Sequence, residues 1–215
     1  MTKPRPRVLL ADDHRLVAEA LKSLLASEFE LLGVVEDGRA LVAAAKQLHP
    51  DVIVADITMP HLNGLDALLQ LRKDNPNVKV VFLTMHKDVA YARRALESGA
   101  SGFVLKHSAP AELLDAIRAA LGGKTYLTPA LAGEVLQAMK RAPQTANDPV
   151  ASLTPRQREI LQLFAEGRSA KEIGAALGIS ARTVEFHKYQ MMDSLGLHAN
   201  AELVHFAIKH GIVAV

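Results

Sequence analysis

The chain contains no cysteine, and this absence excludes several kinds of chemistry. Without thiols it can form no disulfide bond, no cysteine-ligated zinc site and no covalent intermediate on sulfur. A cysteine-free composition is typical of proteins in a reducing compartment, so we predict a cytoplasmic location.

Long apolar runs are missing as well. A membrane-spanning helix needs roughly 18–20 consecutive apolar residues, and no stretch of this chain approaches that length. The basic start of the chain is followed by Val8-Leu9-Leu10-Ala11, a run too short for the apolar core of a signal peptide. We therefore predict no membrane association.

The chain also lacks a strong charge of either sign. Its formal net charge is +2 over 215 residues, and both halves are close to neutral. Any DNA binding must therefore come from the local placement of charges. What the chain does have is a hydrophobic fraction of 49%, enough to build the core of one large domain or two small ones.

The first half alternates between strand-like and helix-like segments. Short runs rich in Val and Leu are nearly continuous in hydrophobicity, as expected for strands that are buried on both faces. They lie at 7–11, 31–35, 52–56, 78–84 and 102–106. Segments with apolar residues every three or four positions separate them. The pattern predicts an α/β fold, a doubly wound parallel sheet with helices on both faces.

The second half has a different pattern. A helix is predicted at 128–141, and the polar, proline-containing segment after it, 142–151, is predicted to be a linker. Beyond the linker the pattern is all-helical, with helices expected at 155–166, 170–177, 181–195 and 200–210. We therefore predict a first domain at 1–124, a connecting helix and linker at 125–151, and a second domain at 152–215.

Polar residues stand at the ends of four predicted strands. Asp12 and Asp13 follow the first strand, Asp56 ends the third, Thr84 ends the fourth and Lys106 ends the fifth. In an open parallel sheet these ends lie along one edge, where such folds place their sites. Three carboxylates, a hydroxyl and an ammonium would then converge. Such a cluster can bind a divalent cation and accept a phosphoryl group as an acyl phosphate.

Each of these residues also has an ordinary structural interpretation. An aspartate between a strand and a helix is often only an N-cap, as Asp13 could be. Asp56 and Lys106 could be solvated charges, and Thr84 alone is uninformative. The joint pattern favours function: Asp12 and Asp13 as metal ligands, Asp56 as acceptor, and Lys106 and Thr84 as partners of the phosphoryl oxygens.

The same residues carry a resemblance to a known family. The chain resembles the receiver domain of two-component response regulators over about residues 7–122. The matching motifs are Val8 to Asp13, Asp56-Ile57-Thr58-Met59-Pro60 followed by Asn63-Gly64, Leu83-Thr84, and Gly102-Phe103-Val104-Leu105-Lys106. This resemblance implies a CheY-like fold with five strands in the order 2-1-3-4-5.

The resemblance also implies roles for individual residues. Asp56 would be phosphorylated by a sensor histidine kinase, and Thr84 and Phe103 would move together on activation. Phe103 is equally well explained as a core aromatic residue. The ligands of Mg²⁺ or Mn²⁺ would be Asp13, Asp56 and the backbone of Thr58, with support from Asp12.

Two departures from known patterns refine this interpretation. Receivers usually have proline after the lysine, where this chain has His107. A cis peptide bond before a non-proline residue costs about 2.5–4 kcal/mol, so the cis bond of the family is disfavoured here, while the role of Lys106 is retained. Phosphatases of the haloacid dehalogenase type need a second aspartate two residues after the first, and this chain has Thr58 there.

A helix-turn-helix pattern occupies residues 170–189. Gly178 stands in a tight turn between two predicted helices, the second of which would enter the major groove of DNA with its first residues at the base edges. An acidic side chain there is repelled by phosphate unless it reads a cytosine. The predicted DNA contacts are Lys171, Thr183 and Lys188 at phosphates, Val184 at a thymine methyl group, and Glu185 and Tyr189 on the same helix.

This pattern alone is weak, because many small helical bundles contain one. Residues 152–213 also resemble the LuxR-type (NarL/FixJ) output domain, which implies four helices with the third as the recognition helix and the fourth as a common dimerisation element. The matching motifs are Leu153 to Leu161, Ala165 to Ser169, Lys171-Glu172-Ile173, Leu177 to Ser180, Thr183-Val184, His187, and Leu195-Gly196-Leu197.

The output half departs from its family at two places. Ala170 stands where asparagine is frequent, and Asp193-Ser194 stands where basic residues are frequent. With acidic residues near the DNA, we expect modest affinity as a monomer and a contribution from dimerisation. His187 has two interpretations, a packed helix residue or a phosphate contact.

The sequence therefore predicts a DNA-binding transcriptional response regulator, not an enzyme, that is switched by phosphorylation of Asp56. Its partners would be a sensor histidine kinase, double-stranded DNA and a second copy of the chain in a homodimer. Phosphorylation would free the recognition helix from the receiver, favour the dimer, or both. The alternatives are a constitutive DNA-binding regulator whose receiver only dimerises, and a phosphotransfer or phosphatase protein whose helical tail binds protein.

Overall fold

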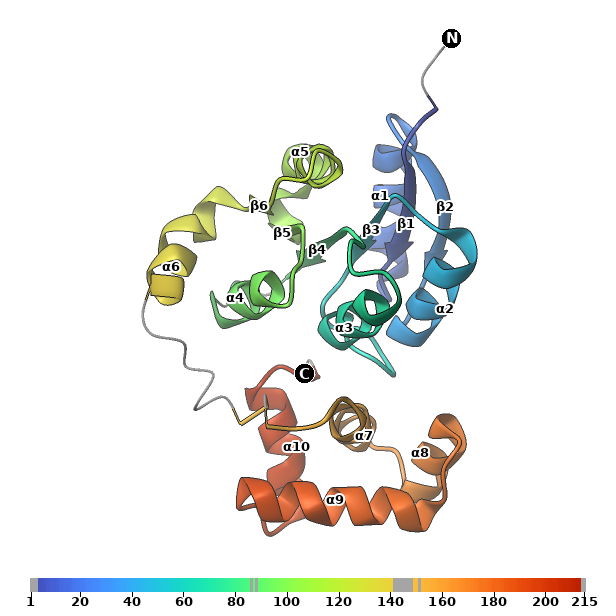
Figure 1. The fold of residues 1–215 in the computed structure, drawn as a ribbon, viewed down its shortest axis with the longest axis vertical. Helices are drawn as coiled ribbons and strands as arrows, with labels where there is room; N and C mark the ends of the chain where they lie inside the picture. The colour runs from blue at the N-terminus through green and yellow to red at the C-terminus, as the bar shows by residue number, and fades with distance from the viewer. Residues whose placement is uncertain (1–3, 86, 88, 141–148, 151, 214–215) are drawn as a thin grey trace.

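The structure, a computed structural model, describes residues 4–85, 87, 89–140, 149–150 and 152–213, and it consists of an α/β half and an all-helical half (Figure 1). The predicted linker at 142–151 lies almost entirely outside the described residues. No helix in the described part has both the length and the apolar character that crossing a membrane requires.

The α/β half is built on a parallel sheet with the strand order β2-β1-β3-β4-β5-β6. The first five strands are those predicted: β1 (Arg7–Ala11), β2 (Glu30–Val35), β3 (Val52–Ala55), β4 (Val80–Thr84) and β5 (Gly102–Leu105). The predicted count of five is wrong, because β6 (Tyr126–Leu127) pairs with β5 and adds a sixth strand. This strand lies within 125–151, the segment predicted to connect the two domains.

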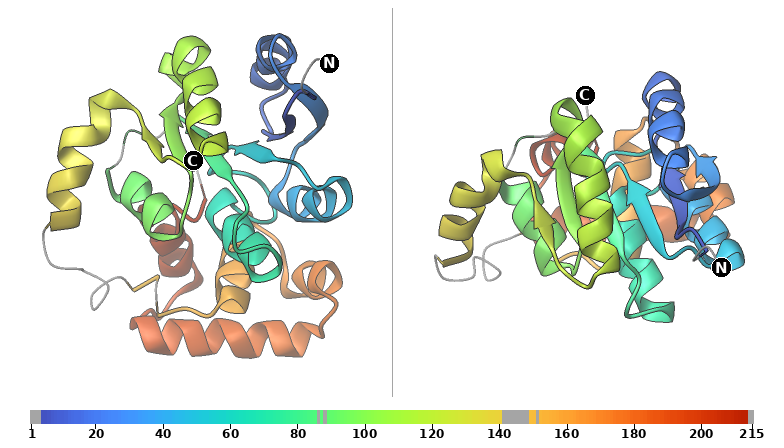
Figure 2. Two further views of the ribbon diagram at one scale, coloured as in Figure 1. Left: turned by 45° about the horizontal axis from the view of Figure 1, so that its top comes forward. Right: turned by 90° about the horizontal axis from the view of Figure 1, so that it is seen from above.

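Helices cover both faces of the sheet. On one face α1 (Arg15–Ala26) and α5 (Ala109–Leu121) pack together, and on the other lie α2 (Gly38–Leu48), α3 (Gly64–Asp74) and α4 (Val89–Glu97) (Figures 1 and 2). The helices end where the sequence predicts. At the end of α2, for example, His49 adopts φ 48° before Pro50, because the residue before proline avoids the α region.

Helix α6 (Pro129–Lys140) packs on α4 rather than standing apart as a connection. Its residues Leu131 and Val135 are buried in the same core as α4. The turn between β6 and α6 is fixed by Thr128, whose side chain is fully buried and whose hydroxyl accepts a hydrogen bond from the Leu105 N–H at 3.2 Å. The edge of the sheet beside β5 is therefore covered by the chain itself.

Within residues 152–213 the helical half has four helices, with bounds within one residue of those predicted: α7 (Pro155–Ala165), α8 (Ala170–Leu177), α9 (Ala181–Leu195) and α10 (Asn200–Lys209). Serine and threonine caps explain where they begin. Thr154 and Ser169 form capping boxes at α7 and α8, and Ser180 accepts a hydrogen bond from the Thr183 N–H at the start of α9. Gly178 ends α8 at φ 66° and makes the turn into α9.

The two halves are in direct contact. Helix α7 packs against α3, and the guanidinium of Arg94 on α4 donates to the carbonyl of His210, just after α10, at 3.1 Å. Helix α9 lies on the opposite side of the helical half, with α7, α8 and α10 between it and the sheet (Figures 1 and 2). The predicted recognition helix is therefore not covered by the α/β half.

Gly64 shows how closely α3 approaches the carboxyl end of β3. A Cβ atom at this position would lie 2.3 Å from the carbonyl oxygen of Asp56 and 2.9 Å from the ring of Phe82. Only glycine fits there without a shift of backbone, which gives the Asn63-Gly64 motif a steric explanation.

We predict that Gly64→Ala lowers the free energy of unfolding by roughly 1–3 kcal/mol through overpacking. Gly133 in α6 is the matched control, because a Cβ there meets nothing within 4 Å. Gly133→Ala should raise the free energy of unfolding by about 0.5–1 kcal/mol. Urea denaturation measures both, and a Gly64→Ala variant as stable as the wild type would contradict the steric argument.

Candidate functional site

Three charged side chains meet at the carboxyl edge of the sheet. The ammonium of Lys106 lies 2.7 Å from Oδ2 of Asp12 and 2.6 Å from Oδ2 of Asp56. The side chains are 5%, 1% and 2% exposed respectively, so this is a buried ion triad. The sequence prediction that these strand ends converge is confirmed by this geometry, and the alternative of solvated charges is wrong for Asp56 and Lys106.

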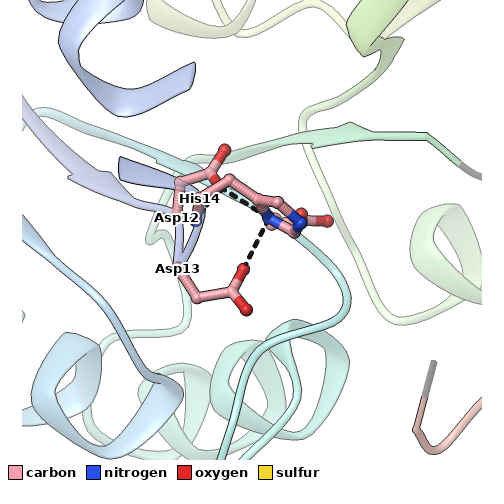
Figure 3. Close-up of side chains that lie close together, drawn as sticks. Asp12, Asp13 and His14 are labelled. Atoms are coloured by element: carbon pink, nitrogen blue, oxygen red, sulfur yellow. Dashed lines mark hydrogen bonds and ion pairs between the residues drawn. The ribbon is translucent and has the colours of Figure 1, made fainter. Parts of the chain in front are cut away.

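Asp13 and His14 extend the cluster toward solvent. Figure 3 shows the imidazole of His14 turned toward two carboxylates, with Nδ1 at 2.8 Å from Oδ1 of Asp13 and 3.3 Å from Oδ1 of Asp12. One ligand atom from each of Asp12, Asp13, His14 and Asp56 lies within 4.8 Å of the others. The N-cap position of α1 is His14, so the interpretation of Asp13 as an N-cap is wrong.

The remaining predicted residues of this edge lie around the triad. The backbone N–H of Thr58 donates to Oδ1 of Asp56 at 3.3 Å. Thr84 ends β4 and is paired in register with Leu105, directly before Lys106. Thr84 and Phe103 are both fully buried, and Phe103 belongs to the core under α2, α3 and α4. Their joint movement remains a prediction.

Burial and charge act against each other in this cluster. Burial raises the pKa of Asp56 above its ordinary value, because a carboxylate is poorly solvated there, and the charge of Lys106 only partly offsets this. Burial alone would lower the pKa of Lys106, but the carboxylates of Asp56 and Asp12 outweigh it and raise that pKa. The ammonium of Lys106 is therefore charged at neutral pH and lies against both buried carboxyl groups.

The donor set fits a small divalent cation. Asp12, Asp13 and Asp56 offer carboxylate oxygens within a few ångströms of one another, and Mg²⁺ prefers such oxygen ligands together with water. Asp13 is 30% exposed, so the cluster is open to solvent on this side. The imidazole of His14 is a further possible ligand, for which softer divalent ions have more affinity than Mg²⁺.

A cavity of about 510 Å³ opens above Asp13, and both halves of the molecule line it. Its lining residues are Asp13, His14, Thr58, Met59 and Pro60 from the α/β half, and Gln162, Glu166, Ile212 and Val213 from the helical half. The loop from Asp56 to α3 therefore shares this open cavity with residues about a hundred or more positions away. Sequence reasoning missed these four contributions from the helical half.

A buried polar network joins this loop to α7. The side-chain amide of Gln162 donates to the carbonyl of Met59 at 2.8 Å, and its oxygen accepts from the N–H of Asn63 at 2.8 Å. Next to it, Nε of Arg158 lies 2.6 Å from Oδ1 of Asp66, and these side chains are only 11% and 8% exposed. The groups satisfy each other across the domain boundary, which makes the contact specific.

On the helical half, the predicted DNA contacts are only partly accessible. Val184 is 0% exposed and belongs to the core, so the prediction that it touches a thymine methyl group is wrong. Lys188 is 7% exposed, and its ammonium lies 2.6 Å from Glu185 and 5.3 Å from the ring centre of Phe164. Lys188 is therefore held within the fold and does not face a phosphate in this conformation.

The outward face of α9 presents other side chains. Tyr189, as predicted, is 63% exposed, and Phe186 is 59% exposed although sequence reasoning passed over it. Arg182 is exposed one turn before Phe186, and Lys171 and Thr183 are at least partly accessible. The helical spacing of 182, 186 and 189 could have revealed this face, because these positions fall on one side of a helix. His187 is partly exposed, and its Nδ1 has no hydrogen-bond partner among the described residues.

Two family models match the chain. Residues 8–118 match the response regulator receiver domain, and residues 151–207 match the bacterial regulatory proteins of the luxR family. The chain belongs to the LuxR-type response regulators. The architecture predicted from the motifs, a receiver followed by a LuxR-type helical domain, is thereby confirmed.

This response regulator is similar along nearly its whole length to curated relatives. It is 36% identical to the transcriptional regulatory protein MctR of Rhizobium johnstonii, covering 99% of this chain and 97% of that protein. It is 31% identical to the response regulator UvrY of Escherichia coli, covering 95% of this chain and 94% of that protein.

Solved structures show the same likeness. One is a structure of the RcsB response regulator of Salmonella typhimurium, from work on its conformational dynamism for DNA interaction. It aligns with a TM-score of 0.64 at 26% identity, covering 97% of this chain and 99% of that one. A structure of the RcsB–DNA complex aligns with a TM-score of 0.59 at 27% identity, covering 94% and 97% of the two chains.

We predict that Lys106→Met lowers the free energy of unfolding by about 3–5 kcal/mol, because it leaves two buried carboxylates without a counter-charge. Adding Asp56→Asn should recover part of the loss. Lys22, whose ammonium is 2.5 Å from Glu19 at the surface, provides the control, and Lys22→Met should cost less than about 1 kcal/mol. Urea denaturation at neutral pH measures all three, and equal losses at Lys106 and Lys22 would refute a buried triad.

Proposed function

We propose that this response regulator controls transcription by binding DNA and that phosphorylation of Asp56 switches its activity. The observation that carries this proposal is the buried triad of Asp12, Asp56 and Lys106 beside the open carboxylate of Asp13. A carboxylate that is held next to an ammonium and within reach of a divalent cation is arranged to accept a phosphoryl group.

The chemistry assigns one task to each residue. A carboxylate oxygen of Asp56 attacks the phosphorus of the donor, the bond from phosphorus to the donor breaks, and the donor leaves with its electron pair. Lys106 then pairs with a phosphoryl oxygen, and Thr84 donates a hydrogen bond to another. Asp12, Asp13, Asp56 and the backbone of Thr58 would hold Mg²⁺ or Mn²⁺, which when bound offsets the charge between carboxylate and phosphoryl oxygens.

The partners follow from the family and its relatives. We propose a sensor histidine kinase as phosphodonor, double-stranded DNA as target and a homodimer as the binding form. We also propose a cytoplasmic location, where the DNA is, and the role of a regulator rather than of an enzyme. We keep the domain boundaries at 1–124, 125–151 and 152–215 as a proposal, with β6 and α6 of the connecting segment packed on the receiver.

The DNA-binding face that we propose is the outward side of α9 and the start of α8. It consists of Lys171, Arg182, Thr183, Glu185, Phe186 and Tyr189. Phe186 takes the role of apolar base contact that the buried Val184 does not fill. Because α9 already faces away from the receiver, phosphorylation does not need to uncover it, and promotion of the dimer becomes the favoured route of activation.

The same observation favours a second candidate function. A recognition helix that is accessible in the docked chain suits a constitutive DNA-binding regulator whose receiver serves only as a dimerisation module. The two functions differ in whether the affinity for DNA changes on phosphorylation.

We expect the purified chain, incubated with Mg²⁺ and a small acyl-phosphate donor, to gain one phosphoryl group by intact mass. Asp56→Asn should gain none, and the adduct should be lost in mild base, as acyl phosphates are. Omitting the divalent cation should abolish the adduct, because nothing then offsets the repulsion between carboxylate and donor. An adduct of equal yield on Asp56→Asn would overturn the assignment of the acceptor.

For DNA, we expect Phe186→Ala to weaken specific binding about tenfold or more, in line with about 1–3 kcal/mol per base contact. Leu136 on α6 is 56% exposed and serves as the matched control, since Leu136→Ala removes exposed apolar surface from the receiver half, away from α9 and α10. Titration of a DNA fragment selected by the wild type measures both variants. Equal affinities would remove Phe186 from the interface.

A further inference from the structure

One hydroxyl group bridges the two ends of the turn that carries Lys106. It belongs to Thr128, which lies between β6 and α6 and is fully buried. Its Oγ1 accepts a hydrogen bond from the backbone N–H of Leu105 at 3.2 Å, and its O–H donates to Oε2 of Glu112 at 2.8 Å. Leu105 directly precedes Lys106, and Glu112 lies in the first turn of α5. The hydroxyl therefore ties the strand before Lys106 to the helix after it.

The turn itself supplies little to hold its shape. Lys106–Ser108 form a short 3-10 helix in which His107 is exposed, and histidine does not fix its own backbone angle as proline would. Ser108 stands at the N-cap of α5, but its side chain makes no capping hydrogen bond within the described residues. The placement of Lys106 therefore depends on groups outside the turn.

The backbone of Thr128 adds a second connection to the same strand. Its N–H donates to the carbonyl of Phe103 at 2.9 Å and so continues the pairing of β6 with β5. On the other side of β5, Leu105 pairs with Thr84 of β4. The end of β5 is therefore held from both sides, and Lys106 leaves the strand from a fixed point.

Lys106 needs such a fixed point because its ammonium makes two short contacts at once. It lies 2.7 Å from Oδ2 of Asp12 and 2.6 Å from Oδ2 of Asp56, and its side chain is only 5% exposed. The ammonium stands at the end of a flexible four-carbon stem, so its position follows from where the backbone begins. A displacement of about 1 Å in an active site can cost about a hundredfold in rate.

We infer that Thr128 is a positioning residue for phosphoryl transfer, because it places the ammonium of Lys106 for its contact with the phosphoryl group; this rests on the proposed phosphorylation of Asp56. Thr128 acts through the backbone of Leu105 and not by contact with the phosphoryl group. Glu112 is the anchor that orients the hydroxyl. The segment after β6 thereby contributes to a site built at the ends of β1, β3 and β5.

Three variants separate the hydroxyl from the rest of the side chain. Thr128→Val replaces the hydroxyl with a methyl group, so Leu105 loses its acceptor. Thr128→Ser keeps the hydroxyl and removes only the methyl group. Glu112→Ala removes the anchor at a position that is partly exposed, where a truncation is tolerated better than in the core.

Two control variants lie in the same segment. Thr125→Val removes a threonine hydroxyl at an exposed position three residues earlier. Tyr126→Phe tests Glu112 from its other side. Burial raises the pKa of Tyr126, and the carboxylate of Glu112 beside its phenol raises that pKa further. Tyr126→Phe therefore removes a neighbour of Glu112 and leaves the hydroxyl of Thr128 in place.

The experiment uses the full-length chain and two measurements. Intact mass follows the rate at which the phosphoryl group is gained from acetyl phosphate in the presence of Mg²⁺. Titration calorimetry with Mg²⁺ alone measures the affinity for the cation, and circular dichroism confirms the fold of each variant. Lys106 is not among the ligands that we propose for the cation. A displaced ammonium therefore slows phosphoryl transfer without weakening the binding of Mg²⁺, whereas general damage to the site lowers both.

We expect Thr128→Val to lower the initial rate about tenfold or more. Thr128→Ser should react nearly as fast as the wild type, and Glu112→Ala should lose rate by a smaller factor than Thr128→Val. Thr125→Val and Tyr126→Phe should keep the wild-type rate. The Mg²⁺ affinity of Thr128→Val should not fall, because an ammonium that moves away from the carboxylates repels the cation less.

The remaining outcomes are distinct. If the wild type gains no phosphoryl group, the proposed function fails and this inference fails with it. If the wild type reacts and Thr128→Val reacts equally fast, or Thr128→Ser is as slow as Thr128→Val, the role of the hydroxyl is refuted while phosphorylation stands. A joint loss of rate and Mg²⁺ affinity in Thr128→Val would make its role structural and overturn the inference. If that variant does not fold, Glu112→Ala decides, and an unchanged rate there refutes the inference.

Discussion

The functional edge of the sheet depends on one ammonium group between two buried carboxylates. Lys106 lies within 2.7 Å of both Asp12 and Asp56, which stand at the ends of β1 and β3, while Lys106 itself follows β5. Asp12 and Asp56 have carboxylate oxygens within 4.8 Å of each other, and two like charges so close in the interior are tolerable only with such a counter-charge. The interaction therefore ties the ends of three strands together around Asp56. Any change of charge at Asp56 therefore alters the electrostatic energy of Lys106 and, through it, of Asp12.

The interior of the domain contact is also polar. Gln162 and Arg158 on α7 satisfy backbone and side-chain groups of the loop and helix that follow Asp56. A buried polar network of this kind is stable only while each member has its partner, because a lost partner leaves a buried polar group unsatisfied. This gives the loop beside Asp56 a direct connection to the helical half. Helix α9, the proposed recognition helix, lies on the far side of the helical half from that contact (Figure 1).

The strands and Val184 show which features of the fold are predictable from the sequence. The first five strands were predicted because runs of Val and Leu that are buried on both faces have no other suitable structure. Strand β6 was not, since Tyr126–Leu127 carries no strand pattern and becomes a strand only by pairing with β5. Val184 was assigned to DNA because it stands near the start of the recognition helix. Its burial follows from how α9 packs, which its position in the sequence does not reveal.

By itself, the sequence determined the two folds, the order of the domains and the meeting of Asp12, Asp13, Asp56, Thr84 and Lys106. These are consequences of local hydrophobic patterns, caps and a parallel sheet whose strand ends share one edge. Only the tertiary structure decided that Gln162 and Glu166 line the cavity above that edge, that α6 covers the sheet beside β5, and that α9 faces outward. Asn63 and Gln162 are 99 residues apart, and such contacts depend on the relative placement of whole domains, which no local pattern encodes.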